Sequence, residues 1–185
     1  MEQGEMMDSF DHAVAPVTAA LLAGGVGVLL LAAGIAKLRD RDTFLGTLAA
    51  YRLVPDPLLG PAAWALGAVE TVLGTMLLGG VSVRAAGYGA ALLFVLFALS
   101  MAVNVMRGRT DLSCGCLPGL ASARLSWGAV ARTLLLAPPA LLPGLAGLPA
   151  AALLRYQSLA AGACLLALGL AASHLLPAGA EEPSA

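Results

Sequence analysis

The sequence is poor in charge. Asp, Glu, Lys and Arg together make up only 11% of its 185 residues, whereas soluble domains carry about 25%. Hydrophobic residues make up 59%, and the mean hydropathy is +0.88. Because so few side chains prefer water, the composition predicts an integral membrane protein. Its length suits a bundle of about four or five spans through the lipid bilayer, in a multi-pass protein of the cell membrane.

The side chains and motifs of several common functional classes are also scarce. A net charge of −1 gives no basic surface for nucleic acid. Two histidines, far apart in the sequence, cannot form a metal cluster without help. No Gly-rich phosphate loop, Ser-His-Asp set or paired Cys-x-x-Cys motif is found in the sequence. The sequence therefore indicates no cofactor and no metal.

Long apolar runs predict an all-α, polytopic transmembrane helix bundle, since about 20 apolar residues cross a bilayer. A short helix over 44–54 should lie at the surface, with Tyr51 and Arg52 among the lipid headgroups. Prolines 138, 139 and 143 should kink or end the fourth span. The spans are expected over 17–36, 58–80, 85–106, from 125 onward, and 152–176, so that one domain over 17–176 lies between tails at 1–16 and 177–185.

Two charged residues lie well inside the predicted spans. Glu70 is near the middle of the second span, between Gly67 and Gly74, which would let a neighbouring helix approach closely. A carboxylate at that depth faces the bundle interior, water or a basic partner. Arg132 lies about 10 Å inside the fourth span, where an arginine either snorkels to the surface or pairs within the bundle. We expect Glu70 and Arg132 to pair.

Lys37 and Cys164 lie at positions where their side chains are common in membrane proteins. Lys37 is the sole lysine and opens a charged collar over 37–43, at the membrane edge after the first span. Cys164 lies in the fifth span, where a lone cysteine is most often a small apolar filler. We therefore expect Cys164 to be buried away from the other cysteines.

A short polar break after the third span carries the other two cysteines. It reads Asp-Leu-Ser-Cys-Gly-Cys-Leu-Pro-Gly over 111–119. Between Cys114 and Cys116, Gly115 tolerates the sharp bend that a very small disulfide ring demands. Such a ring departs easily from relaxed geometry, and strained disulfides are more readily reduced. The spacing favours a disulfide that forms and breaks; soft-metal binding and two ordinary loop thiols are the alternatives.

A series of short motifs makes the chain similar to a known family. They are Gly-Ile-Ala-Lys-Leu-Arg-Asp at 34–40, Tyr-Arg-Leu-Val-Pro at 51–55, Val-Glu-Thr-Val-Leu-Gly at 69–74, Cys-Gly-Cys at 114–116, Leu-Ser-Trp at 125–127 and Ala-Arg at 131–132. In this order they resemble the methylamine utilisation protein MauE family, part of the DoxX-like group of small membrane proteins. The resemblance covers residues 17–142 and implies a DoxX-like four-helix core plus a fifth span.

The resemblance also implies a role in thiol–disulfide traffic. In that family, this role is to help process, export or mature the disulfide-rich small subunit of methylamine dehydrogenase. The family often has Asp directly before Cys-Gly-Cys and Phe-Gly after it, whereas here Asp111 is three residues upstream and Leu-Pro-Gly follows. The expected partner is a thioredoxin-like or disulfide-bearing exported protein. A non-enzymatic scaffold or maturation factor and a small-solute transporter are the alternatives. The predicted site comprises the thiols Cys114 and Cys116, supported by Gly115, Glu70, Arg132 and Lys37.

Basic residues are distributed unequally between the two ends of the predicted bundle. Arg84 and Arg155 lie at one end. The loops after the first and third spans hold Lys37, Arg39, Arg41, Arg52, Arg107, Arg109 and Arg124. Since cytoplasmic loops carry the excess of Lys and Arg, this predicts an external N-terminus and a cytoplasmic Cys-Gly-Cys loop. If the protein acts on exported proteins that carry disulfides, Cys114 and Cys116 would instead be expected outside the cell.

Overall fold

The computed structural model describes residues 2–112 and 124–175, with the side chains of 14–112, 124–169 and 171. This part of the chain is helical and contains no β-strand. Within it, five helical stretches are long and apolar enough to cross a membrane, which confirms the predicted all-α bundle. The helices are α1 (Glu2–Arg39), α2 (Arg41–Tyr51), α3 (Asp56–Gly79), α4 (Val83–Met106), α5 (Trp127–Leu134), α6 (Ala137–Ala146) and α7 (Ala152–Leu175).

The fourth span is broken, as its prolines predict. Helix α5 ends at Leu134, α6 begins at Ala137, and the two together form the apolar stretch Trp127–Ala146. Pro138 and Pro139 lie in the first turn of α6. Proline is tolerated there because the first amide groups of a helix have no partner within it, whereas it disrupts a helix interior. At the other end of the chain, α1 already begins at Glu2 and so includes the residues before the first predicted span.

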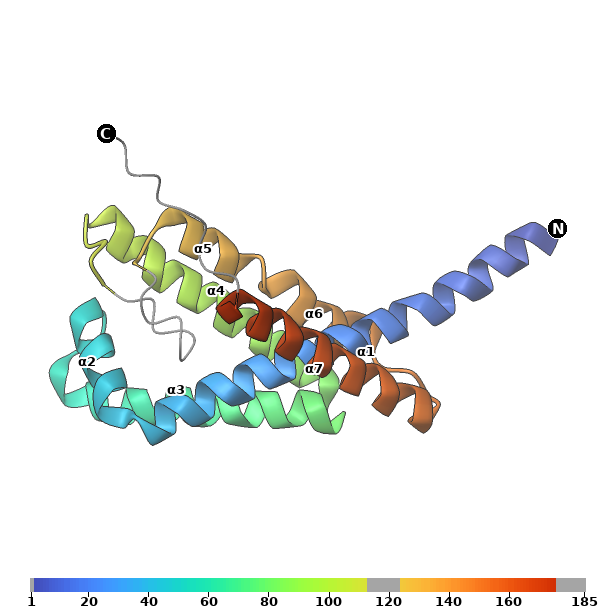
Figure 1. Cartoon of the computed structure of the whole chain (residues 1–185), viewed down its shortest axis with the longest axis horizontal. Helices are drawn as coiled ribbons and strands as arrows, with labels where there is room; N and C mark the ends of the chain where they lie inside the picture. The colour runs from blue at the N-terminus through green and yellow to red at the C-terminus, as the bar shows by residue number, and fades with distance from the viewer. Residues whose placement is uncertain (1, 113–123, 176–185) are drawn as a thin grey trace.

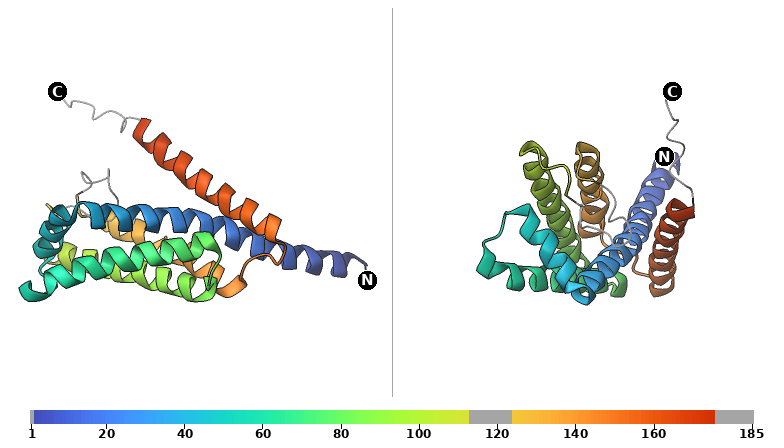
Figure 2. Two further views of the ribbon diagram at one scale, coloured as in Figure 1. Left: turned by 90° about the horizontal axis from the view of Figure 1, so that it is seen from below. Right: turned by 60° about the vertical axis from the view of Figure 1, so that its left-hand side comes forward.

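Helix α1 lies at the centre of the bundle (Figure 1). It packs on α3, α6 and α7, while α4 packs on α3, α5 and α6. The core is therefore made by four spans: α1, α3, α4 and the broken pair α5–α6. Helix α7 packs mainly on α1 and lies on the outer side of it (Figure 2). This is the predicted four-helix core with an added fifth span.

Glycines bring α1 and α3 into backbone contact. A methyl group at Gly74 would lie only 2.6 Å from the amide nitrogen of Leu31 and 2.8 Å from the carbonyl oxygen of Gly27. One at Gly34 would lie 2.8 Å from the carbonyl oxygen of Gly67. Small residues allow this approach, which maximises van der Waals contact where lipid supplies no hydrophobic driving force. The close packing predicted at Gly67 and Gly74 is thus confirmed.

Candidate functional site

Helices α1 and α3 hold a buried ion pair between Lys37 and Glu70. The ammonium nitrogen of Lys37 donates to both carboxylate oxygens of Glu70, each at 2.8 Å. The two side chains are only 6% and 1% exposed. Charges this deep are costly unless they are paired with good geometry. The bidentate contact therefore gives each residue the partner that its position requires.

The same glycines that join α1 and α3 position this ion pair. Lys37 follows Gly34 by three positions on α1, and Glu70 follows Gly67 by three positions on α3. Residues three apart share a helix face. Since Gly34 packs against Gly67, the two charged side chains face the same helix–helix boundary. Two phenylalanines enclose the ammonium group, with ring centroids 5.4 Å (Phe44) and 5.7 Å (Phe97) from its nitrogen.

Two sequence predictions about charged residues are wrong. The partner of Glu70 is Lys37, whereas Arg132 is exposed in the last turn of α5. Lys37 does not belong to the surface collar, because it is buried beside α3 while Arg39 and Arg41 are exposed. An exposed Arg132 is consistent with the snorkelling alternative. Of the two buried polar groups that a transporter would use, Glu70 is buried as expected and Arg132 is exposed.

Cys114, Gly115 and Cys116 lie outside the described residues, and a backbone hydrogen bond joins the described residues on either side of them. The amide of Leu125 donates to the carbonyl oxygen of Leu112 at 3.0 Å, which brings the two ends of the loop together. After α4, the amide of Arg109 donates to the carbonyl oxygen of Asn104, also at 3.0 Å. Leu112 and Leu125, which flank the segment in the sequence, therefore lie side by side after α4 and before α5.

Tyr51 packs beside the ends of this loop. It is 8% exposed and belongs to a cluster with Met101, Leu125 and Val130, against which Leu112 also packs. The prediction that Tyr51 lies among the headgroups is therefore wrong, although Arg52 is exposed as expected. The predicted surface helix is α2, and its last residue, Tyr51, connects it to the core in the cluster that contains Leu125.

Cys164 faces outward on α7. The expectation that it is a buried filler is wrong, because this helix packs mainly on α1 and leaves its opposite side exposed. An apolar thiol is acceptable there, since free cysteine behaves as a small hydrophobic side chain. Cys164 therefore provides an internal control for experiments on the loop cysteines.

We expect the Cys-Gly-Cys loop to face the cytoplasm. With Lys37 paired to Glu70, the bias rests on Arg39, Arg41, Arg52, Arg107, Arg109 and Arg124 against Arg84 and Arg155. In a Cys164→Ala protein, a membrane-impermeant maleimide should leave Cys114 and Cys116 unlabelled in intact cells and label them after permeabilisation. If reduced Cys114 and Cys116 are fully labelled in intact cells, the predicted orientation is wrong and the loop faces outward.

Comparison with known proteins gives consistent matches. The family model described as methylamine utilisation protein MauE matches residues 15–146. Methylamine utilization protein MauE of Paracoccus denitrificans is 33% identical over 170 residues, covering 89% of this chain and 90% of its own. Its namesake in Methylorubrum extorquens is 37% identical over 161 residues (86% and 82%), and that of Methylophilus methylotrophus is 45% identical over 93 residues (50% and 48%). No solved structure matches.

Proposed function

The chain belongs to the MauE family, and from that membership we propose that this multi-pass membrane protein serves methylamine utilisation by relaying thiol–disulfide equivalents through Cys114 and Cys116. The Cys-Gly-Cys sequence carries the proposal. The partner is a thioredoxin-like protein or an exported protein whose disulfides must be formed, and the membrane is the cell membrane. Two thiols separated by a single glycine can cycle between dithiol and disulfide within one short segment.

The chemistry is a reversible exchange. The thiolate of one loop cysteine attacks a sulfur of the partner's disulfide, forming a mixed disulfide and releasing one partner thiolate. The second loop cysteine then attacks the mixed disulfide at the sulfur of the first. The products are a Cys114–Cys116 disulfide and a partner dithiol, so two electrons and two protons pass to the partner. Run in reverse, the same steps oxidise a partner dithiol.

Positive charge near the loop supports this role. Arg107 and Arg109 precede the loop, and Arg124 is the first described residue after it. Cationic neighbours lower the pKa of a thiol and so raise the fraction of the reactive thiolate. The hydrogen bond between Leu112 and Leu125 supports it further, because it holds together the two residues between which the Cys-Gly-Cys segment lies in the sequence.

A thiol-trapping experiment tests the relay. In membranes treated with mild oxidant, two thiols, Cys114 and Cys116, should become protected from a thiol-reactive polymer and should become reactive again on reduction. The Cys164→Ala variant is the matched control: it has one reactive thiol fewer in every condition, and the same two thiols should become protected on oxidation. Loop cysteines that stay alkylatable under oxidant that converts an ordinary redox dithiol would exclude the relay.

A variant test in cells separates the relay from the scaffold alternative. Cells that depend on this protein for growth on methylamine should lose growth with the double variant Cys114→Ser, Cys116→Ser and retain it with Cys164→Ser. Retained growth with the double variant, at normal protein level, would favour a scaffold or maturation factor whose cysteines are structural.

A further inference from the structure

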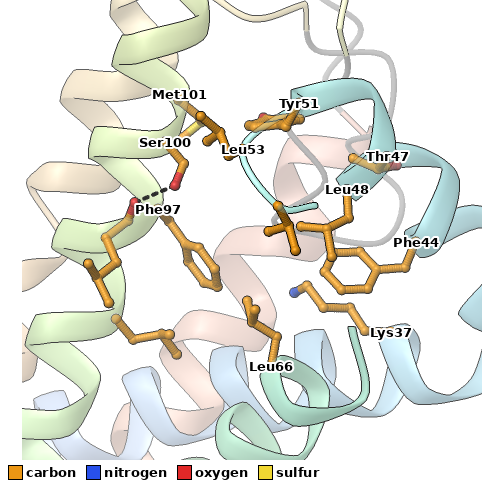
Figure 3. A pocket seen from close by; sticks show the side chains of 13 residues that line it. Lys37, Phe44, Thr47, Leu48, Tyr51, Leu53, Leu66, Phe97, Ser100 and Met101 are labelled. Carbon is orange, nitrogen blue, oxygen red and sulfur yellow. Dashed lines mark hydrogen bonds between the residues drawn. The ribbon is translucent and has the colours of Figure 1, made fainter. Parts of the chain in front are cut away.

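A pocket of about 200 Å³ lies beside the buried ion pair, between α2, α3 and α4 (Figure 3). Leucines and phenylalanines make most of its lining, with Thr47 and Ser100 as the uncharged polar exceptions besides Tyr51. Two lining residues at its outer side, Leu53 and Leu96, are 39% and 49% exposed. The pocket is therefore a recess that a small molecule can enter from outside the bundle.

Lys37 forms the polar end of this recess. Its side chain reaches from α1 to a position between Phe44 and Phe97, so that the ammonium group faces the pocket (Figure 3). An ammonium group has three N–H donors. Glu70 has two oxygens, each 2.8 Å from the nitrogen, and among the described residues Lys37 has no other hydrogen-bond partner. At least one donor thus remains for an occupant of the pocket.

The charge balance restricts what the occupant can be. Because Glu70 neutralises Lys37, an anionic ligand would compete with an existing pair and would bring an uncompensated negative charge into an apolar site. A cationic ligand would meet an ammonium group. A neutral hydrogen-bond acceptor satisfies the remaining donor without either cost.

Size and lining restrict it further. A cavity of about 150 Å³ lined by apolar side chains accommodates benzene, so a recess of about 200 Å³ accommodates one substituted ring. Phe44 and Phe97 offer aromatic surfaces against which a ring packs favourably. We propose that this pocket binds a neutral, ring-bearing carbonyl compound, with its carbonyl oxygen accepting a hydrogen bond from Lys37. This proposal does not depend on the proposed thiol–disulfide relay.

Three fluorinated ligands of one shape test the proposal. They are 4-fluoroacetophenone, which has the carbonyl acceptor; 4-fluoro-α-methylstyrene, which replaces it with an alkene; and 4-fluorobenzoate, which is an anion. Each is titrated into lipid nanodiscs with and without the protein, and saturable broadening of the fluorine resonance reports binding beyond partition into lipid. The ketone should bind about tenfold more tightly than the alkene, because the alkene leaves the donor unpaired. The anion should bind least.

Two variants locate the binding. Ser100→Trp fills the pocket and should abolish ketone binding, whereas Leu99→Trp, at a 56% exposed neighbour outside the pocket, should not. Thr47→Trp fills the pocket from α2 and replaces Ser100→Trp if that variant does not purify as a folded protein. In the double variant Lys37→Met, Glu70→Leu, the preference for ketone over alkene should fall to about onefold, since the donor is gone.

Several results would overturn the proposal. They are equal binding of ketone and alkene to the parent protein, a preference for the benzoate, and ketone binding that persists unchanged in both tryptophan-filled variants. A ketone preference that survives removal of Lys37 and Glu70 would place the acceptor contact elsewhere and would also end it.

Discussion

Replacing Lys37 with methionine is expected to destabilise the folded protein by about 3–5 kcal/mol. The substitution keeps a long apolar stem but leaves the carboxylate of Glu70 buried at 1% exposure without its cation. An uncompensated charge in the bundle is far more costly than the loss of one surface contact. The free energy of unfolding, from titration of the purified protein with a denaturing detergent, measures the effect.

The double variant Lys37→Met, Glu70→Leu should be less destabilised than Lys37→Met alone, because it removes both charges from the apolar interior. Arg39→Met is the matched control: it removes a cation from the same last turn of α1, at an exposed position, and should change stability by less than about 1 kcal/mol. The single variant Glu70→Leu completes the comparison. If the losses of stability of the two single variants add up to that of the double variant, the ion pair seen in the structure is not energetically coupled.

The number and type of the elements could be predicted because they depend on local composition. Each span needs about 20 apolar residues, and the breaks at 52–55 and 80–82 are marked in the sequence by prolines or glycines. The division of the fourth span follows from Pro138 and Pro139, whose missing amide hydrogens and fixed φ angles act within one turn.

The partner of Glu70 could not be predicted from depth alone. Depth suggested Arg132, because both residues lie inside predicted spans, whereas Lys37 is near the end of α1. The pairing depends on the register between two antiparallel helices, and that register is set by the contact of Gly34 with Gly67. The spacing Gly-x-x-Lys on one helix and Gly-x-x-Glu on the other was the available signal.

The outward face of each helix was also hard to predict. In a membrane, lipid is as apolar as the bundle interior, so the alternation of polar and apolar residues that marks the buried face of a soluble helix is weak. For this reason the sequence around Cys164 did not indicate that it faces outward. For Tyr51 the prediction failed in the opposite direction. Its amphipathic ring suits the membrane interface, but packing in the cluster with Met101 and Leu125 buries it.

The contact between α1 and α7 should be the most sensitive to an added side chain. A methyl group at Gly162 would overlap the backbone carbonyl of Leu21, and one at Gly24 would overlap that of Leu159. Backbone atoms cannot rotate aside as a flexible side chain can, so one helix must move. We expect Gly162→Val to destabilise the folded protein by at least the roughly 1–3 kcal/mol typical of overpacking, measured as the free energy of unfolding in denaturing detergent.

Gly169→Val is the matched control for Gly162→Val. It introduces the same β-branched residue into α7, at a position where an added methyl group meets nothing within 4 Å, and should have little effect. Because α7 packs mainly on α1 while the ion pair joins α1 to α3, the coupling energy between Lys37 and Glu70 should be the same in the Gly162→Val background as in the parent. An unchanged coupling energy in a destabilised protein would show that the four-span core holds its ion pair independently of the fifth span. A lost coupling energy would mean that α7 is needed to keep α1 in register with α3.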